Sequence, residues 1–154
     1  NKNVLIETLF KGFIDDITNA EKFEGTEFGA QLFVKSINTS FPIMEKYAFL
    51  FKDSQIVWRR LPNLQSEMSD FLALKQSKFL ELIQLYAQQN ILRSSISDAQ
   101  MNFLAGQFMF IIYGWFNTVG SGHKSIVEFR EYMIRILLPY LKKSELEAWE
   151  KLLN

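Results

Sequence analysis

Hydrophobic residues recur along the chain at the three- and four-residue spacing of amphipathic helices, and no stretch alternates with period two as strands do. A first helix is predicted over residues 1–19, with Asn1 as its N-cap. A second is predicted over 26–38 and broken at 38–40, where Asn, Thr and Ser follow one another. Pro42 then falls in the first turn of a short third helix, where its missing N–H costs nothing.

The rest of the chain is predicted to hold a helical turn over 55–61 and a long helix over 62–90. Three capping boxes mark the starts of later helices, namely Ser97 with Gln100, Ser125 with Glu128, and Ser144 with Glu147. The glycines at 120–122 end the first of these helices, and Pro139 is expected to loosen the last turn of the helix over 125–143. We therefore predict an all-α fold, an orthogonal helical bundle of about seven helices.

The stretch from Ser97 to Val119 has no charged residue after Asp98, and its apolar side chains fall on every side of a helix. A surface helix keeps one polar face, so this helix must be buried on more than one side. Its strongly apolar part, 103–116, is shorter than the roughly 20 residues that a membrane span needs. One face should pack on the protein's own core, and another face on something further.

The 154 residues, of which 48% are hydrophobic, are enough for a single domain with a full core. Seventeen basic residues balance seventeen acidic ones, so the chain lacks the basic excess with which proteins displace phosphate counterions. The absence of cysteine excludes disulfides and fits a reducing compartment. With no signal-peptide or transmembrane pattern visible, we expect a cytoplasmic protein with no membrane partner.

Residues that could carry catalysis are scarce. His123 is the only histidine and lies in a Gly-rich turn, where we expect it to be solvated or to cap a helix. Asp15 and Asp16 are neighbours on a helix, so their side chains point about 100° apart and do not form a catalytic pair. Neither a nucleophile elbow nor a phosphate-binding loop is present. We predict that the protein is not an enzyme and uses no metal or cofactor.

Stripes of Phe and Met on several predicted helices allow two interpretations, an ordinary core or a pocket for an apolar small molecule. In the second interpretation, Tyr86, Gln107 and Tyr113 would orient the ligand, and Trp58 belongs to either the core or a pocket wall. The candidate ligand-binding residues are Phe13, Ile17, Phe33, Met44, Phe51, Trp58, Met68, Phe71, Phe79, Tyr86, Gln107, Phe108 and Ile112.

Self-association is predicted through the last long helices. Ala105, Gly106 and Gly114 would let another helix approach closely, and the helix over 125–143 has a wider apolar band than one core face requires. With their symmetry copies, the two helices would form an isologous four-helix dimer interface. The candidate interface residues are Phe103, Gly106, Phe110, Tyr113, Gly114, Phe129, Met133, Ile136, Leu137 and Tyr140.

Three stretches resemble the C-terminal ligand-binding and dimerisation domain of TetR-family transcriptional regulators. Residues 1–5 (Asn-Lys-Asn-Val-Leu) are similar to the segment that follows the family's DNA-recognition helix, although Asn3 stands where an acidic residue is commoner. Residues 88–93 and then 97–115 resemble the family's polar turn and its Gly-containing apolar helix ending in Trp. Residues 129–141 are similar to the family's penultimate or last helix. These motifs are loosely defined, and together they span essentially the whole chain.

The resemblance implies that residues 1–154 are one effector-binding and dimerisation domain, preceded in the intact protein by a helix-turn-helix of about 45 residues. The helix over 1–19 would link the two. An apolar effector would shift this linker and release operator DNA, which only the missing head would contact. From the residues alone, the alternative is a free-standing helical module that dimerises or carries an apolar ligand without any DNA role. The residues upstream of Asn1 would distinguish the two hypotheses.

Overall fold

The computed structural model describes residues 1–21, 29–118 and 125–153. Within these ranges the chain forms eight α-helices and two short 3-10 helices, and β-structure is limited to one isolated bridge. The prediction of an all-α fold is therefore confirmed. The elements are α1 (Lys2–Ala20), α2 (Gly29–Lys46), α3 (Phe49–Lys52), α4 (Ser54–Arg60), α5 (Pro62–Gln88), α6 (Asp98–Thr118), α7 (Ile126–Leu137), η1 (Leu138–Tyr140), α8 (Lys143–Glu150) and η2 (Lys151–Leu153).

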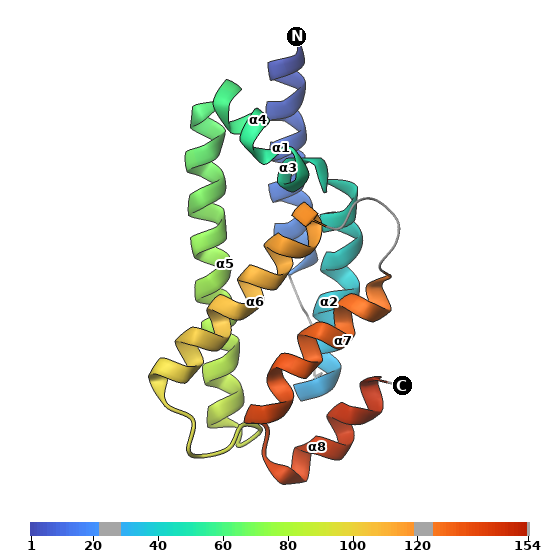
Figure 1. Ribbon diagram of the computed structural model, residues 1–154, viewed down its shortest axis with the longest axis vertical. Helices are drawn as coiled ribbons and strands as arrows, with labels where there is room; N and C mark the ends of the chain where they lie inside the picture. The colour runs from blue at the N-terminus through green and yellow to red at the C-terminus, as the bar shows by residue number, and fades with distance from the viewer. Residues whose placement is uncertain (22–28, 119–124, 154) are drawn as a thin grey trace.

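The helices lie in two main directions (Figure 1). α1 and α5 run along the long axis, α6 and α7 cross the front of the molecule obliquely, and α8 closes the end opposite the N-terminus. α5 packs along α6, and α2 packs against both α1 and α7. The core between them takes large, fully buried side chains from every part of the chain, including Phe10, Phe13, Phe51, Tyr86, Phe108, Met133 and Trp149. None of the helices in the described ranges is long and apolar enough to cross a membrane.

Side-chain caps begin α1 and α6 as the sequence predicts. Asn1 Oδ1 accepts a hydrogen bond of 3.1 Å from the N–H of Asn3. At α6, Ser97 Oγ accepts from the N–H of Gln100 at 3.1 Å, and Gln100 Oε1 accepts from the N–H of Ser97 at 2.9 Å. This reciprocal pair is a complete capping box, which satisfies two N–H groups that the helix itself leaves unpaired.

Loss of the Ser97 hydroxyl should destabilise the fold measurably. The Ser97→Ala substitution removes the acceptor for the N–H of Gln100, and we expect it to lower the free energy of unfolding by about 1 kcal/mol in urea denaturation followed by circular dichroism. Ser94→Ala, in the exposed loop just before α6, is the control and should change that free energy by less than about 0.5 kcal/mol. Equal stability of the two variants would contradict the prediction.

α2 continues through the predicted break at 38–40 and carries Pro42 within it, so the prediction of a separate short helix there is wrong. The hydroxyls of Thr39 and Ser40 each donate to the carbonyl four residues earlier, at 2.7 and 2.8 Å. Bonded in this way, they no longer draw the backbone out of the helix. Phe41, which is buried, anchors the second half of the helix in the core.

The C-terminal helices agree with the sequence only in part. Ser125 caps α7, accepting from the N–H of Glu128 at 3.4 Å. α7 ends at Leu137, and Pro139 lies in the 3-10 turn η1, as expected for a proline that loosens the last turn. The capping box predicted over 144–147 is wrong, because the residue before it already belongs to α8. The glycines predicted to end α6 lie outside the described residues.

α8 is held to the body by Trp149, which is fully buried. The Trp149 ring lies 5.4 Å from the Phe33 ring of α2 and 6.0 Å from the Tyr86 ring of α5, measured between centroids. The Tyr86 hydroxyl donates to the carbonyl of Gly29 at 2.9 Å. Gly29 has a φ of 58°, a conformation that glycine adopts without the cost of a side chain. These contacts join α2, α5 and α8.

Candidate functional site

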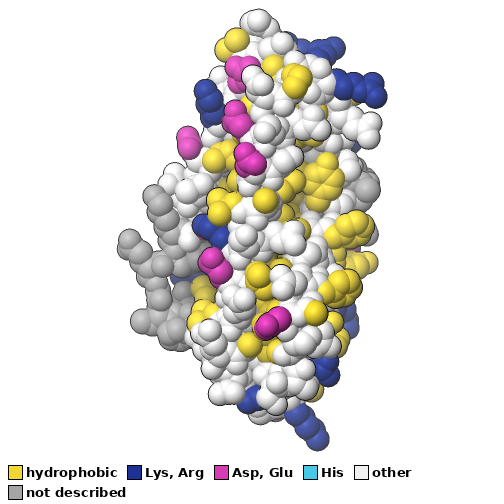
Figure 2. Space-filling view, turned by 90° about the vertical axis from the view of Figure 1, so that its left-hand side faces the viewer, with side chains coloured by type: hydrophobic (Ala, Val, Ile, Leu, Met, Phe, Trp, Pro, Cys, Tyr) yellow, Lys and Arg dark blue, Asp and Glu magenta, His cyan; other side chains and the backbone are white. Residues whose placement is uncertain are grey.

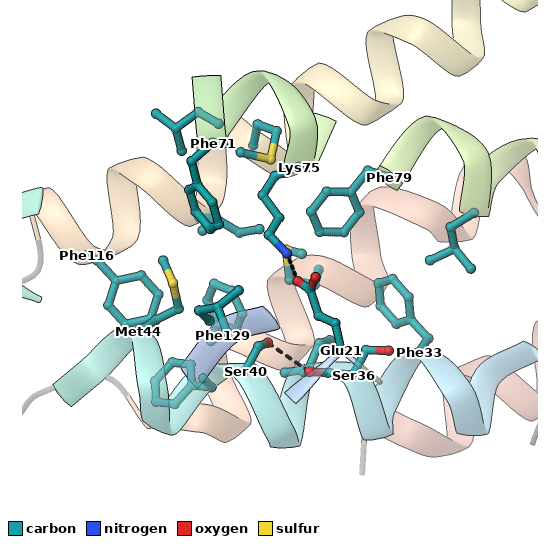
Figure 3. Close-up of a pocket in the computed structure, with 18 residues that line it drawn as sticks. Glu21, Phe33, Ser36, Ser40, Met44, Phe71, Lys75, Phe79, Phe116 and Phe129 are labelled. Atoms are coloured by element: carbon teal, nitrogen blue, oxygen red, sulfur yellow. Dashed lines mark hydrogen bonds and ion pairs between the residues drawn. The ribbon is translucent and has the colours of Figure 1, made fainter. Parts of the chain in front are cut away.

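An apolar cavity of about 100 Å³ lies in the middle of the bundle, between α1, α2, α5, α6 and α7 (Figure 3). Phenylalanine rings and aliphatic side chains make up most of its wall. A wider hollow of about 270 Å³ adjoins it, bounded by the end of α1, α2 and α5. The side chains that line the cavity are Ile17, Glu21, Phe33, Ser36, Ile37, Ser40, Phe41, Met44, Phe71, Leu72, Lys75, Phe79, Leu82, Met109, Ile112, Phe116, Phe129 and Met133.

Polar side chains interrupt this lining on one side only, where the hollow adjoins the cavity. They are Glu21, Ser36, Ser40 and Lys75, which line both spaces. The hydroxyls of Ser36 and Ser40 donate to carbonyls of α2 at 2.9 and 2.8 Å. A hydroxyl has a single hydrogen to donate, so these two groups act as acceptors toward a molecule in the cavity while their bonds within α2 persist.

Lys75 reaches from the middle of α5 across the mouth of the cavity to the carboxylate of Glu21, just past the end of α1 (Figure 3). The Lys75 side chain is only 13% exposed, and its ammonium lies 5.3 Å from the centroid of the Phe71 ring. Burial lowers the pKa of Lys75 to about 8, and the charge of Lys78 adds to the shift. The Glu21 carboxylate acts in the opposite direction, since an anion favours the charged ammonium.

The cavity contains part of the predicted ligand-binding set. The predicted residues that line it are Ile17, Phe33, Met44, Phe71, Phe79 and Ile112. The structure places the others elsewhere, with buried side chains at Phe13, Phe51, Met68, Tyr86 and Phe108, and half-buried ones at Trp58 and Gln107. Of the groups expected to orient a ligand, Tyr86 is instead bonded to Gly29, and the Tyr113 hydroxyl lies 3.3 Å from Ser54 Oγ.

The predicted ligand-binding set does not include the polar residues Glu21, Ser36, Ser40 and Lys75. Lys75 did carry a signal, because it stands four residues after Phe71 and four before Phe79, inside the apolar stripe of α5. A charged residue at such a position must face the interior of the protein, where charges are rarely found without a partner. Glu21 carried no signal, since it follows the last residue of α1 and pairs with a side chain far along the chain.

The exposed apolar residues of α6 fit the predicted dimer face. Phe103 and Phe110 are 60% and 80% exposed, and they lie two helical turns apart on the same side of α6. A Cβ added at Gly114 would meet no other atom within 4 Å, so this part of α6 is open. Gly106 is different, because a Cβ there would lie 3.8 Å from the Gln76 side chain of α5. That is an ordinary van der Waals distance, so Gly106 faces α5 but packing within the chain does not require a glycine there.

Other predicted interface residues are buried or half-buried within the chain. Phe129, Met133 and Leu137 of α7 are buried inside the chain, and the first two line the cavity. Tyr113, Ile136 and Tyr140 are half-buried. The large hydrophobic side chains of α7 that are exposed are Val127 and Tyr132, which were not predicted. In Figure 2 hydrophobic side chains gather along the right-hand edge, which is the front of Figure 1 where α6 and α7 lie.

The acidic groups considered for catalysis have structural partners or face solvent. Asp16 accepts hydrogen bonds from the Tyr47 hydroxyl at 2.8 Å and from the Lys46 ammonium at 3.0 Å, and Asp15 is exposed. The Tyr47 hydrogen bond, together with Lys46, holds the pKa of Asp16 below its ordinary value. His123 lies outside the described residues. In the ranges that the structure covers, no group of three or more His, Cys, Asp or Glu side chains could hold a metal ion.

Comparison with known proteins agrees with the fold. A family model named TetR, described as a bacterial transcriptional repressor, matches residues 14–149. The structure is similar to the crystal structure of a TetR-family transcriptional regulator from Marinobacter aquaeolei VT8, with a TM-score of 0.82 and 15% sequence identity, over 99% of this chain and 77% of that one. No curated protein matches the chain.

The family match places the chain in a class of transcriptional regulators. The chain belongs to the TetR family of bacterial transcriptional regulators. The resemblance found in the sequence is thereby confirmed, as is the expectation that the protein is not an enzyme, because the family is not an enzymatic one. Members of the family typically dimerise and bind effectors.

Proposed function

We propose that this chain is the effector-binding and dimerisation domain of a TetR-type regulator, with residues 1–154 forming one domain. The observation that supports it best is the cavity, which is enclosed by five helices and lined almost wholly by apolar side chains. Ligand sites in proteins are typically apolar hollows with a few convergent polar groups. Here an apolar body would contact the rings, and the polar groups at the mouth would fix its orientation.

The route from effector to DNA would pass through α1. This helix contributes Ile17 to the cavity wall and is followed directly by Glu21 at the mouth. Its other end is the N-terminus of the described chain, at the far end of the molecule (Figure 1). An effector that binds better to one position of α1 than to another would shift that equilibrium. In a dimer, such a shift would change the spacing of the two DNA-binding heads and so release the operator.

The dimer would form through the outer faces of α6 and α7. Phe103, Phe110, Val127 and Tyr132 are large apolar side chains that remain more than half exposed on these two neighbouring helices. Exposed apolar side chains gathered in this way mark interaction sites. An isologous pairing would place two helices from each chain in a four-helix interface.

Filling the cavity should weaken binding of a neutral apolar probe. We expect the domain to bind N-phenyl-1-naphthylamine with a rise in fluorescence, and Ser36→Leu to weaken this binding by at least about tenfold, because the added carbons occupy the cavity. Asn38→Leu, on the exposed side of the same helix, should bind the probe like the unchanged protein. Absence of binding by the unchanged protein, with no ligand found by native mass spectrometry, would overturn the effector-binding proposal.

The DNA role needs the intact protein. We expect the gene to encode a helix-turn-helix upstream of Asn1, and the full-length protein to shift its own promoter fragment in a gel assay. The 154-residue domain, which has no net charge, should give no shift at the same concentration. An initiator methionine directly before Asn1 would contradict the proposal and favour a free-standing helical module.

A further inference from the structure

The mouth of the cavity carries an unusual arrangement of charges. Lys75 is largely buried among apolar side chains, with Phe71 and Phe79 on either side of it (Figure 3), and it pairs with Glu21. The Nζ of Lys78 lies 3.7 Å from the other carboxylate oxygen of Glu21. Among the described residues, one carboxylate is therefore shared between two ammonium groups, which gives the mouth of the cavity more positive than negative charge.

This charge balance distinguishes between classes of ligand. A cationic ligand would either displace a lysine from Glu21 or become the third positive group around one carboxylate. An anionic ligand would instead supply a second counter-ion for the two lysines, which share Glu21 among the described residues. Like charges held close together in a partly buried site repel strongly, whereas a charge-assisted hydrogen bond to a buried ammonium is among the stronger polar contacts in proteins.

The hydrogen-bonding groups of the wall point to the same class. Ser36 and Ser40 present acceptor oxygens to the cavity while their hydroxyl hydrogens are donated to α2. Among the described side chains that line the inner cavity, Lys75 is the charged donor. An acceptor therefore suits this end of the cavity, and a buried ammonium is best matched by an acceptor that carries the opposite charge.

We propose that the cavity takes an amphipathic monocarboxylate, an apolar body with a single carboxylate, whose head group replaces Glu21 as the counter-ion of Lys75. This inference rests on the proposed function, since it names the chemical class of the effector. The apolar body would lie among the rings of Phe33, Phe79 and Phe116, which line the inner cavity.

The same exchange would couple effector binding directly to α1. Glu21 follows the last residue of α1, and its pairing with Lys75 ties that end of the helix to α5. A carboxylate that takes over Lys75 leaves Glu21 with Lys78 alone, at 3.7 Å on the same helix, and so weakens this tie. An alcohol of the same shape would fill the cavity without exchanging with Glu21. The two kinds of ligand should therefore differ in affinity and also in their effect on α1.

The experiment compares matched pairs of probes on the 154-residue chain. Decanoate is compared with decanol, and 4-butylbenzoate with 4-butylbenzyl alcohol, by displacement of N-phenyl-1-naphthylamine and by isothermal titration calorimetry. Decyltrimethylammonium tests the opposite charge. We expect at least one carboxylate to bind about tenfold or more tightly than its alcohol, and the ammonium compound to bind most weakly. The two pairs distinguish a straight-chain acid from an aromatic one.

Substitutions then test the assignment to Lys75. Lys75→Met keeps the apolar stem and should weaken carboxylate binding about ten- to hundredfold while leaving the alcohol unchanged. Lys52→Met, at an exposed lysine that lines neither the cavity nor the hollow, is the control and should change carboxylate affinity less than about threefold. Glu21→Gln should tighten carboxylate binding, because it removes the competing anion. A purely structural role of the ion pair would change both members of a pair of probes equally.

Each outcome has a distinct meaning. If alcohols bind as well as carboxylates, and Lys75→Met changes neither, the monocarboxylate proposal is overturned while the apolar effector site stands. Tighter binding of decyltrimethylammonium would overturn it in favour of a cationic ligand. If neither the probes nor N-phenyl-1-naphthylamine bind, the proposed function itself fails.

Discussion

Phe129→Asp is expected to leave the domain unfolded, not to separate a dimer into folded monomers. Phe129 is 4% exposed and lies in an aromatic cluster, with its ring centroid 5.2 Å from that of Phe41, 5.3 Å from Trp115 and 5.9 Å from Phe116. These contacts join α2, α6 and α7. An aspartate at this position would lose these ring contacts. It would also place a carboxylate among aromatic rings, with no cationic side chain in the cluster to pair with it.

The expected magnitude is large compared with the stability of a domain. Removing a buried phenylalanine side chain costs about 3–5 kcal/mol, and an uncompensated carboxylate adds several kcal/mol more. A typical domain is stable by only about 5–15 kcal/mol. Phe129→Asp should therefore show little cooperative thermal unfolding by circular dichroism and should aggregate on purification.

Val127→Asp is the matched control, because it makes the same change two residues earlier on α7 at a side chain that is 52% exposed. It should keep the helical spectrum and a cooperative transition, since exposed substitutions usually change stability by less than about 0.5 kcal/mol. A folded, monomeric Phe129→Asp protein would contradict the structure and restore Phe129 to the dimer interface.

The fold was predictable where hydrophobic periodicity decides it. The apolar stripes of α1, α5 and α6 define long helices because burial of one helix face outweighs every local preference. The helix end predicted at 38–40 was wrong. Thr39 and Ser40 favour helix ends in isolation, but in the structure their hydroxyls donate to carbonyls within α2. The choice between these two states depends on whether Phe41 finds a core to enter, which is a property of the tertiary structure.

The site was less predictable, because a cavity is a gap between helices and not a property of one helix. Phe13 and Ile17 belong to the same stripe of α1, yet only Ile17 lines the cavity, since α3 and α5 close over Phe13 with the rings of Phe51 and Phe71. The same limit applies to α6, which is apolar on every side. The sequence predicts that two faces are buried, and only the structure distinguishes the face that carries Phe108, buried within the chain, from the one that carries Phe110, which is exposed.

Phe110→Asp is expected to dissociate the dimer without harming the fold. Phe110 is 80% exposed within the chain, so the substitution removes almost no intramolecular packing. Aromatic residues at the centre of an interface typically cost about 2 kcal/mol or more when they are lost. In an isologous dimer each substitution occurs twice, so the dimer should weaken by about 4 kcal/mol, or roughly a thousandfold in dissociation constant. Analytical ultracentrifugation over a range of concentrations measures this change.

Leu74→Asp provides the comparison, because Leu74 is a 55% exposed apolar residue on α5, which is not one of the two helices of the proposed interface. It introduces the same charge and should leave the dissociation constant of the dimer within about threefold of that of the unchanged protein. Both variants should retain the helical spectrum. If Phe110→Asp remained a dimer while Leu74→Asp became a monomer, the interface would lie on α5. The exposed phenylalanines of α6 would then need another partner.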